Sequence, residues 1–283
     1  MKLLSIIVGR EDGESARMSR VVLKEAYENG CEIELINLKY LQIKPCIGCM
    51  KCVTKLFNPN HAGECPIQDD MAWLDRKILE ADGLLFVAPM YECSVPGEYR
   101  MMCDRLGPSH DITFKKFLDE RSKSMGMAVT TDHRWYTPKP VAFITHGGSE
   151  WSYMAYPSVA TPSISLGLQI VDKVHFDYND GILTNECHME RLREMGRHII
   201  TMIQKRPEER EYVGPQGYCP VCHNDVMRLD FDSNKCECAL CGTIGTISVK
   251  NNKVQVDFTE DAKILSHLID GGRTKHGTIL KFV

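Results

Sequence analysis

Short apolar runs that alternate with helical segments limit how this chain can fold more than any other feature. Five runs have strand character: Lys2–Val8, Glu32–Leu38, Gly83–Ala88, Pro140–Thr145 and Leu168–Val174. Amphipathic helices are predicted at Ser15–Asn29, Asp69–Ala81 and His188–Gln204. A continuous apolar run closed by a turn residue, such as Gly83–Ala88 before Pro89, is typical of a strand buried on both faces. The pattern therefore predicts an α/β fold, with a five-stranded parallel sheet and helices on both faces.

The sequence changes character after Lys205. A charged stretch over residues 206–210 precedes Gly214, Pro215 and Gly217, so we place a linker at residues 206–217. Residues 1–205 fit a flavodoxin-like domain, in which ligands bind at the carboxyl ends of the strands. Residues 218–283 form a small cysteine-rich module with a tail. In that tail, Thr259–Ile269 predicts a short helix that stops at Gly271 and Gly272.

Charge, composition and the N-terminal segment argue against several classes of partner and against secretion. The formal net charge is −4, and no basic face with interleaved aromatic side chains is visible, so we expect no nucleic-acid partner. No apolar run has the length of a membrane span, so we expect no membrane partner. The segment Met1–Gly9 lacks the pattern of a secretory signal, so we expect a cytoplasmic protein.

Glycine- and proline-rich loops follow three of the predicted strands. The first loop, Gly9–Arg17, leads into a helix N-terminus, where free backbone N–H groups and the helix dipole suit a phosphate. The second begins with Pro89-Met-Tyr-Glu92, and the third contains Thr145-His-Gly-Gly148. Because the carboxyl ends of parallel strands share one edge of a sheet, we expect these loops to converge on one ligand.

Five motifs, in this order along the chain, carry a family resemblance: Pro45–Cys52, Cys65–Met71, Ala81–Gly83, Ala88–Tyr91 with Gly97, and Asp104–Leu106. Over residues 1–205 the chain resembles the NADPH-dependent FMN reductase family, and within it the iron–sulfur flavoproteins. The resemblance implies an FMN site formed by Gly9, Arg10, Ser15, Arg17, Pro89, Met90, Tyr91, Glu92, Thr145, Gly147 and Gly148. The first loop would hold the phosphate, the second would lie along the isoalloxazine and ribityl, and the third would close over the pyrimidine side.

The first loop departs from the family pattern because it is rich in acidic residues. Glu11, Asp12 and Glu14 would repel a phosphate dianion unless they point outward or are offset by Arg10 and Arg17. The sequence leaves open which of these arrangements holds.

The first cysteine cluster comprises Cys46, Cys49, Cys52 and Cys65. Three thiols at Cys-x2-Cys-x2-Cys spacing are a typical way to hold three corners of a [4Fe–4S] cube, and Cys65 is the natural fourth ligand. The intervening stretch Thr54–Glu64 makes the last gap longer than in the iron–sulfur flavoproteins. Three interpretations therefore stay open: an iron–sulfur cluster, free or redox-active thiols, and another metal.

The second cysteine cluster comprises Cys219, Cys222, Cys238 and Cys241. The spacing Cys-x2-Cys-x15-Cys-x2-Cys predicts a tetrahedral Zn²⁺ site in a zinc-ribbon module. A rubredoxin-like iron site is the rival interpretation. The flanking segments Met227–Phe231 and Thr243–Val249 look like ribbon strands. Four thiolates leave no open position on the metal, so the site is interpreted as structural, with Cys236 as a bystander.

Together these features predict an FMN-dependent oxidoreductase. We expect it to pass electrons or hydride from NAD(P)H or a ferredoxin-type partner to a small organic or quinone-type acceptor; no catalytic residue is identified. The alternative is a non-catalytic flavin or iron–sulfur carrier, or a redox sensor, whose zinc module binds a protein partner. A homodimer or homotetramer is expected in either case.

Overall fold

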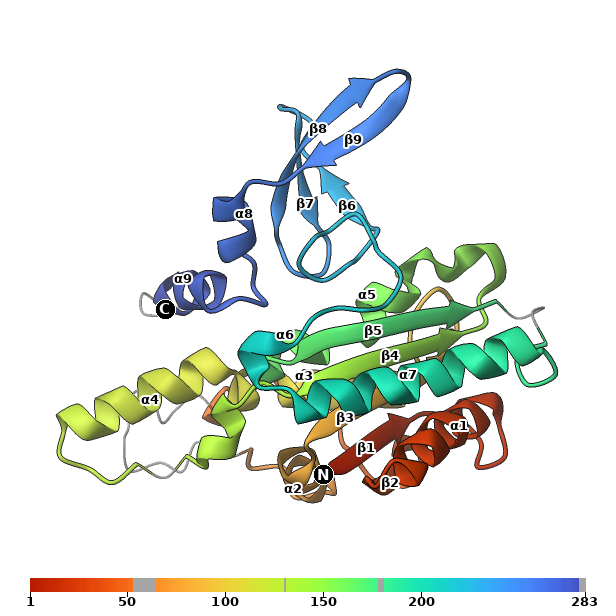
Figure 1. Cartoon of the computed structure of the whole chain (residues 1–283). Helices are drawn as coiled ribbons and strands as arrows, with labels where there is room; N and C mark the ends of the chain where they lie inside the picture. The colour runs from red at the N-terminus through yellow and green to blue at the C-terminus, as the bar shows by residue number, and fades with distance from the viewer. Residues whose placement is uncertain (53–64, 130, 178–180, 280–283) are drawn as a thin grey trace. The chain divides into compact units, whose positions relative to one another are not determined.

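The computed structural model describes residues 1–52, 65–129, 131–177 and 181–279 (Figure 1). The chain divides into two compact units, Met1–Gly214 and Pro215–Val283. The first unit extends beyond residue 205, because Arg210 donates to the Gln169 side chain at 2.9 Å and the Val213 N–H donates to the Val171 carbonyl at 2.9 Å. None of the helices in the described ranges combines the length and apolar character that a bilayer crossing requires.

Five parallel strands form the sheet of the first unit. Their bounds are β1 Lys2–Ile7, β2 Glu32–Asn37, β3 Gly83–Pro89, β4 Pro140–His146 and β5 Gln169–Phe176, in the order β2-β1-β3-β4-β5. The predicted flavodoxin-like sheet is confirmed, with the strand order of that fold. β3 and β4 are buried along their whole length, as their unbroken apolar runs indicate. All five carboxyl ends meet at one edge, where the candidate site begins.

Alternate side chains of these strands face two different helix layers. Leu3 and Ile7 of β1 lie in one core with α1 (Glu14–Glu28) and α7 (Glu186–Gln204), which pack together. On the opposite face, the Phe86 and Phe143 rings stack at 5.7 Å between centroids. Tyr99 of α3 (Gly97–His110) meets Phe86 edge-on at 5.9 Å. Helices thus cover both faces of the sheet (Figure 1).

Shorter elements fill the connections of the first unit. They are η1 Leu38–Tyr40, α2 Met71–Glu80, α4 Ile112–Ser124, η3 His133–Tyr136, η4 Ser149–Met154, α5 Ala155–Val159, α6 Pro162–Leu166 and η5 Pro207–Glu209. Among these, α4 was not predicted from the sequence, because its composition is mostly polar and charged.

An antiparallel sheet forms the second unit. Its strands are β6 Met227–Leu229, β7 Lys235–Cys238, β8 Ile244–Lys250 and β9 Lys253–Asp257, in chain order, followed by α8 Glu260–Ile264 and α9 Asp270–Ile279. The ribbon-like module is confirmed, and β7 and β9 are additional to the two strands predicted. The predicted helix end is wrong: α8 stops at Ile264, and Gly271 and Gly272 lie in the first turn of α9.

Candidate functional site

The first loop presents the uncapped N-terminus of α1. Gly13 is the N-cap residue and no side chain caps the helix, so the N–H groups of the first turn keep their capacity to bind an anion. Ser15 lies in this turn with a buried side chain. Gly9 has a φ of 145° and precedes the turn, whereas Arg10 and Arg17 are exposed. This arrangement fits a phosphate group.

The second loop is tied to the end of β4 by its backbone. The Met90 N–H donates to the His146 carbonyl at 2.8 Å. The next residues form a tight turn in which Tyr91 and Ser94 exchange two backbone hydrogen bonds, of 2.8 and 3.1 Å. The two residues at the tip, Glu92 and Cys93, have φ values of 46° and 65°. The turn leaves the Tyr91 ring exposed, so a flat ligand can stack on it.

The third loop approaches the second closely. Gly147 and Gly148 have φ values of 82° and 91°, and the Gly147 N–H donates to the Phe176 carbonyl at the end of β5. A Cβ atom on Gly148 would lie 3.2 Å from the Cβ of Met90. Glycine is therefore required there by both its conformation and its spacing. Thr145, at the end of β4, is buried, and its Oγ1 lies 2.8 Å from Nδ1 of His175.

His146 connects all three loops, although it is not among the site residues predicted from the sequence. It belongs to the third loop, its carbonyl accepts from Met90 of the second, and its Nε2 lies 2.7 Å from Oγ of Ser15 in the first. Its Nδ1 lies 3.4 Å from Oε2 of Glu14. Burial, with a smaller contribution from the nearby His175, lowers the pKa of His146 to about 4. Glu14 therefore has a partner that the sequence did not suggest.

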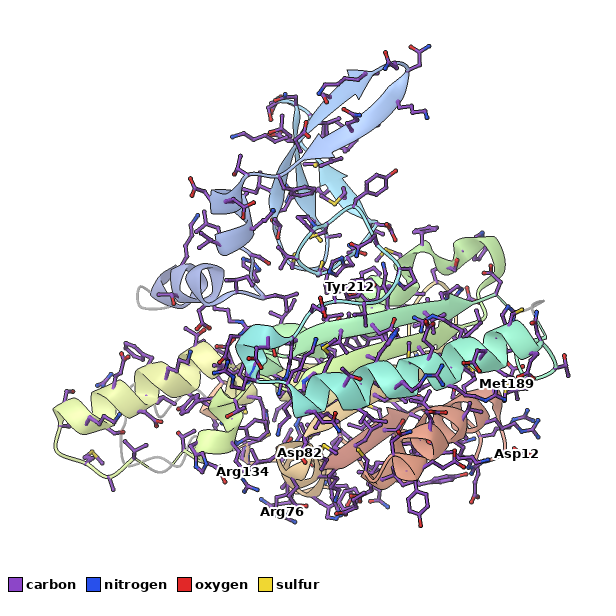
Figure 2. All side chains as sticks on the ribbon, in the orientation of Figure 1. Asp12, Arg76, Asp82, Arg134, Met189 and Tyr212 are labelled. Carbon is purple, nitrogen blue, oxygen red and sulfur yellow. The ribbon has the colours of Figure 1, made fainter. Side chains whose placement is uncertain are left out.

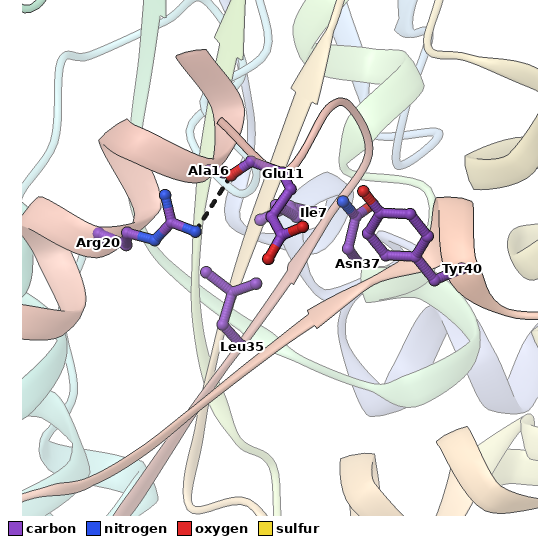
Figure 3. A pocket seen from close by; sticks show the side chains of 7 residues that line it. All are labelled: Ile7, Glu11, Ala16, Arg20, Leu35, Asn37 and Tyr40. Atoms are coloured by element: carbon purple, nitrogen blue, oxygen red, sulfur yellow. Dashed lines mark hydrogen bonds between the residues drawn. The ribbon is translucent and has the colours of Figure 1, made fainter. Parts of the chain in front are cut away.

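A groove adjoins the first loop on the side of β2. It has a volume of about 420 Å³ and is lined by residues that include Arg20, Leu35 and Tyr40 (Figure 3). Asn37, at the end of β2, donates from its side chain to the Gly9 carbonyl at 2.8 Å. Asn37 thus supports the first loop from the groove side.

A buried ion pair flanks the first cysteine cluster. Arg105 of α3 donates to both oxygens of Asp69, and to the Lys44 carbonyl at 3.0 Å. Although burial opposes it, the hydrogen bond to Asp69 raises the pKa of Arg105, with a smaller contribution from Cys65. The pair therefore fixes the chain on both sides of the cysteine loop, just before Cys46 and just after Cys65.

The four thiols of this cluster are near one another but not gathered. Cys46 and Cys49 are exposed, and Cys52 and Cys65 are half-buried. Burial raises the pKa of Cys52, and the charges of the other three thiols raise it further. Among the residues that the structure describes, these four sulfurs do not all lie within 4.8 Å of one another. The predicted loop Thr54–Glu64 falls within residues 53–64, outside the described residues. The donor set has the sulfur chemistry that iron–sulfur clusters use.

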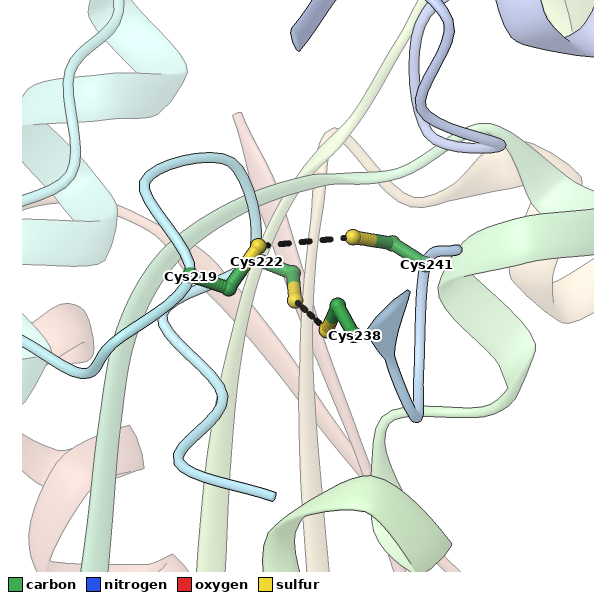
Figure 4. Close-up of side chains that lie close together, drawn as sticks. All are labelled: Cys219, Cys222, Cys238 and Cys241. Carbon is green, nitrogen blue, oxygen red and sulfur yellow. Dashed lines mark hydrogen bonds between the residues drawn. The ribbon is translucent and has the colours of Figure 1, made fainter. Parts of the chain in front are cut away.

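The second cysteine cluster is gathered into one site. The sulfurs of Cys219, Cys222, Cys238 and Cys241 lie within 4.8 Å of one another, and all four residues are buried (Figure 4). Two sulfur pairs are separated by 3.5 Å (Cys219 and Cys241) and 3.4 Å (Cys222 and Cys238). Metal–sulfur bonds of about 2.3 Å place the ligands of a tetrahedral site about 3.8 Å apart. The predicted metal-binding set therefore fits a tetrahedral metal ion.

The two halves of this site repeat one turn. The Cys219 N–H donates to the Asn224 carbonyl at 3.0 Å, and the Cys238 N–H donates to the Thr243 carbonyl at 2.9 Å. The residue after each second cysteine, His223 or Gly242, has a positive φ, of 58° and 70°. Each also donates its N–H to the carbonyl of the first cysteine in its half, at 2.9 Å. Two matched turns thus aim four sulfurs at one centre.

Arg134 lies on the exposed turn η3 and is labelled in Figure 2. In the structure its guanidinium binds the Asp132 carboxylate, with hydrogen bonds of 2.7 to 3.2 Å. Trp135, from the same turn, packs edge-on against His110 at 5.3 Å.

Comparison with known proteins bears on the whole chain. A flavone synthase from Aspergillus candidus is 29% identical to it over 98% of this chain and 87% of the relative. A solved structure described as a flavone reductase superposes with a TM-score of 0.84 at 26% identity, covering 99% of this chain and 89% of that one. An iron–sulfur flavoprotein from Methanocaldococcus jannaschii is 34% identical over 35% of this chain and 48% of its own length.

The family model that matches the chain describes NADPH-dependent FMN reductases, and the match covers residues 1–176. This range contains the three loops and the first cysteine cluster, and it ends at the last residue of β5. The chain is an FMN-dependent oxidoreductase and belongs to the NADPH-dependent FMN reductase family.

Proposed function

We propose that this oxidoreductase transfers electrons between a nicotinamide nucleotide and a flavone-class substrate, a flat ketone conjugated to a carbon–carbon double bond. In the reducing direction, the nucleotide supplies a hydride and solvent supplies a proton, so the double bond gains two hydrogens. FMN supplies the hydride chemistry when bound, and the protein orients it.

One observation carries this proposal: the similarity to the two flavone-named proteins spans both units of the chain. The iron–sulfur flavoprotein relative, in contrast, matches about a third of the chain. A protein that shared only the FMN domain would give no reason to choose among acceptors. The shared second unit therefore favours a flavone-class acceptor over a quinone or a ferredoxin-type partner.

We place FMN at the junction of the three loops. Ser15 and the first turn of α1, with Gly9, Arg10 and Arg17 around them, would hold the phosphate. The second loop, Pro89 to Glu92, would lie along the ring, and Thr145, Gly147 and Gly148 would cover its pyrimidine side. The closeness of Gly148 to Met90 and the uncapped helix support this placement.

We assign Zn²⁺ to the second cysteine cluster, in a structural role, because four thiolates leave no open position. For the first cluster we keep a [4Fe–4S] cluster as the proposal. The hydrogen bonds from Arg105 to Lys44 and to Asp69, which lie on either side of the cysteine loop, support this proposal. A loop that is fixed at both ends can close around a cluster at lower entropic cost.

The proposal is tested by anaerobic turnover of the full-length protein with NADH or NADPH and flavone. The expected product is two hydrogens heavier, and nucleotide deuterated at C4 should place one deuterium on the product. A quinone and reduced ferredoxin serve as the competing acceptor and donor. Rapid quinone reduction with no change in flavone would reject the substrate class while leaving the FMN enzyme intact.

A further inference from the structure

We propose that His146 takes up a proton when the phosphate of FMN binds, so that Glu14, His146 and Ser15 form a charged relay that recognises the phosphate. This inference rests on the proposed placement of the phosphate at Ser15. It starts from one buried contact, the 2.7 Å separation between Nε2 of His146 and Oγ of Ser15. The relay deepens the proposed function because it would separate FMN from flavins that lack the phosphate.

The location of the ring proton decides what Ser15 can do. A neutral imidazole carries one N–H, and a carboxylate favours that hydrogen on the nitrogen that faces it. Oε2 of Glu14 lies 3.4 Å from Nδ1 of His146, so Nε2 is the acceptor. The single hydroxyl hydrogen of Ser15 then points at Nε2. In this state Ser15 has no hydrogen to donate to a phosphate.

A second proton on His146 resolves this conflict. Nε2 then donates to Oγ of Ser15, and Nδ1 donates to Glu14. The hydroxyl hydrogen of Ser15 becomes available to the phosphate, so every donor in the chain of contacts faces an acceptor. The added proton comes from solvent, and the carboxylate of Glu14, which looked unfavourable beside a phosphate, balances the imidazolium charge.

The surroundings of His146 make its charge depend on the phosphate. From α1 it faces Glu14, and its register partner on β5 is Phe176, which does not titrate. The neighbouring His175 of β5 pairs with Thr145 instead, lies 3.3 Å from Asp177, and adds to the lowering of the pKa of His146. From β3 it faces Pro89, which does not titrate. Without a ligand, burial keeps His146 neutral at pH 7. A phosphate dianion one hydroxyl away favours the protonated form, because an opposite charge stabilises it.

The test uses the full chain freed of flavin and titrated with FMN or riboflavin. Flavin fluorescence gives affinity from pH 6.5 to 8.5, and calorimetry in two buffers of different ionisation enthalpy gives proton uptake. We expect uptake approaching about one proton per FMN at pH 7, and affinity that falls by up to about tenfold per pH unit. Riboflavin should show neither effect, because it lacks the phosphate.

Three variants separate the relay from the placement of the site. His146→Gln can still bond Ser15 but cannot ionise, so it should lose the proton uptake and bind FMN about 10- to 100-fold more weakly at pH 6.5. Its riboflavin affinity should be unchanged, which also reports that the variant is folded. Glu14→Gln, at the exposed end of the relay, should reduce the uptake. Ser15→Ala should weaken FMN alone.

Each outcome has one meaning. If Ser15→Ala binds FMN as tightly as wild type, the phosphate does not lie at Ser15, and the placement and the relay both fail. If Ser15→Ala weakens FMN but wild type takes up no proton, the placement stands and the relay is overturned. Undiminished proton uptake in His146→Gln would also overturn the relay, because another group would then be titrating.

Discussion

Asp69 and Arg105 form an ion pair whose side chains are only 1% and 2% exposed, across 36 residues of sequence. Asp69 also accepts from the N–H groups of Lys44 and Met71, at 2.9 and 3.0 Å. One carboxylate therefore joins the segment before the first cysteine cluster, the start of α2 and the helix α3. Removing the guanidinium would leave this carboxylate buried without its counter-charge.

Arg105→Met should therefore destabilise the first unit by about 3–5 kcal/mol, the usual result of breaking one partner of a buried pair. Arg100→Met is the matched control, because Arg100 pairs with Asp104 on the same helix but both side chains are about half exposed. That control should change stability by less than about 1 kcal/mol. Urea unfolding measures both, and equal losses in the two variants would contradict this account.

Tyr91→Ala should weaken FMN binding by about 0.5–1.5 kcal/mol beyond the loss of buried area, because the ring would stack on the flavin. Tyr40→Ala is the control: Tyr40 has the same 61% exposure but lines the groove beside β2. Fluorescence titration with FMN compares the two. An equal affinity in both variants would remove Tyr91 from the site.

Cys238→Ser should lower bound zinc and make the chain beyond about residue 215 sensitive to protease, because metal binding supplies folding free energy to a small module. Cys236→Ser tests the same strand and is equally buried, but Cys236 lies outside the four-sulfur group. It should keep its zinc. FMN content should be normal in both variants, and its loss together with zinc would mean that the two units fold interdependently.

Protein purified anaerobically should carry about four irons and matching sulfide per chain if the first cluster holds a [4Fe–4S] centre. Cys49→Ala should lose both. Cys187→Ala is the control, since Cys187 is also exposed but lies at the start of α7. Protein with full FMN and zinc but without iron and sulfide would leave a flavin enzyme with free thiols.

The pH dependence of stability in the FMN-free protein should report His146. Its folded pKa of about 4 lies below the unfolded value of about 6.5, so the unfolded state binds more protons between these values. Stability from neutral His146 is thus complete above pH 6.5 and falls as pH drops toward 4, by up to about 3 kcal/mol. His146→Gln should flatten this part of the urea-unfolding profile. His133→Gln, with a 92% exposed side chain, should not.

The sheet was predictable because its strands carry their own signal. β3 and β4 are unbroken apolar runs, and such runs are read directly from sequence. β7 was missed because Lys235–Cys238 is short and polar, and its place comes from pairing with β6 and β8. The end of α8 was predicted too late because a glycine pair is only a weak stop signal. The chain leaves the helix at Ile264, before it reaches Gly271 and Gly272.

The individual loops of the site were predictable from the sequence, but the contacts between them were not. Each loop is a local motif, and so is each Cys-x2-Cys pair, which is why the second cysteine cluster could be assembled from spacing. The contact between Ser15 and His146 spans 131 residues, and that between Asp69 and Arg105 spans 36. Such contacts depend on strand order and side-chain direction, which no local pattern encodes. Homologous sequences that vary together at these positions would be the signal to look for.

The two left-handed residues at the tip of the second loop, Glu92 and Cys93, carry a consequence for engineering. Each non-glycine residue in this conformation costs about 1–2 kcal/mol, and glycine would recover the part of this cost that exceeds about 0.4–1 kcal/mol, the amount by which its own freedom favours the unfolded chain. A screen for thermostable variants would therefore select glycine at both positions. If the more stable variants turn over more slowly, the slower variant identifies which side chain, that of Glu92 or that of Cys93, the reaction needs. Stability and catalysis would then oppose each other at this turn.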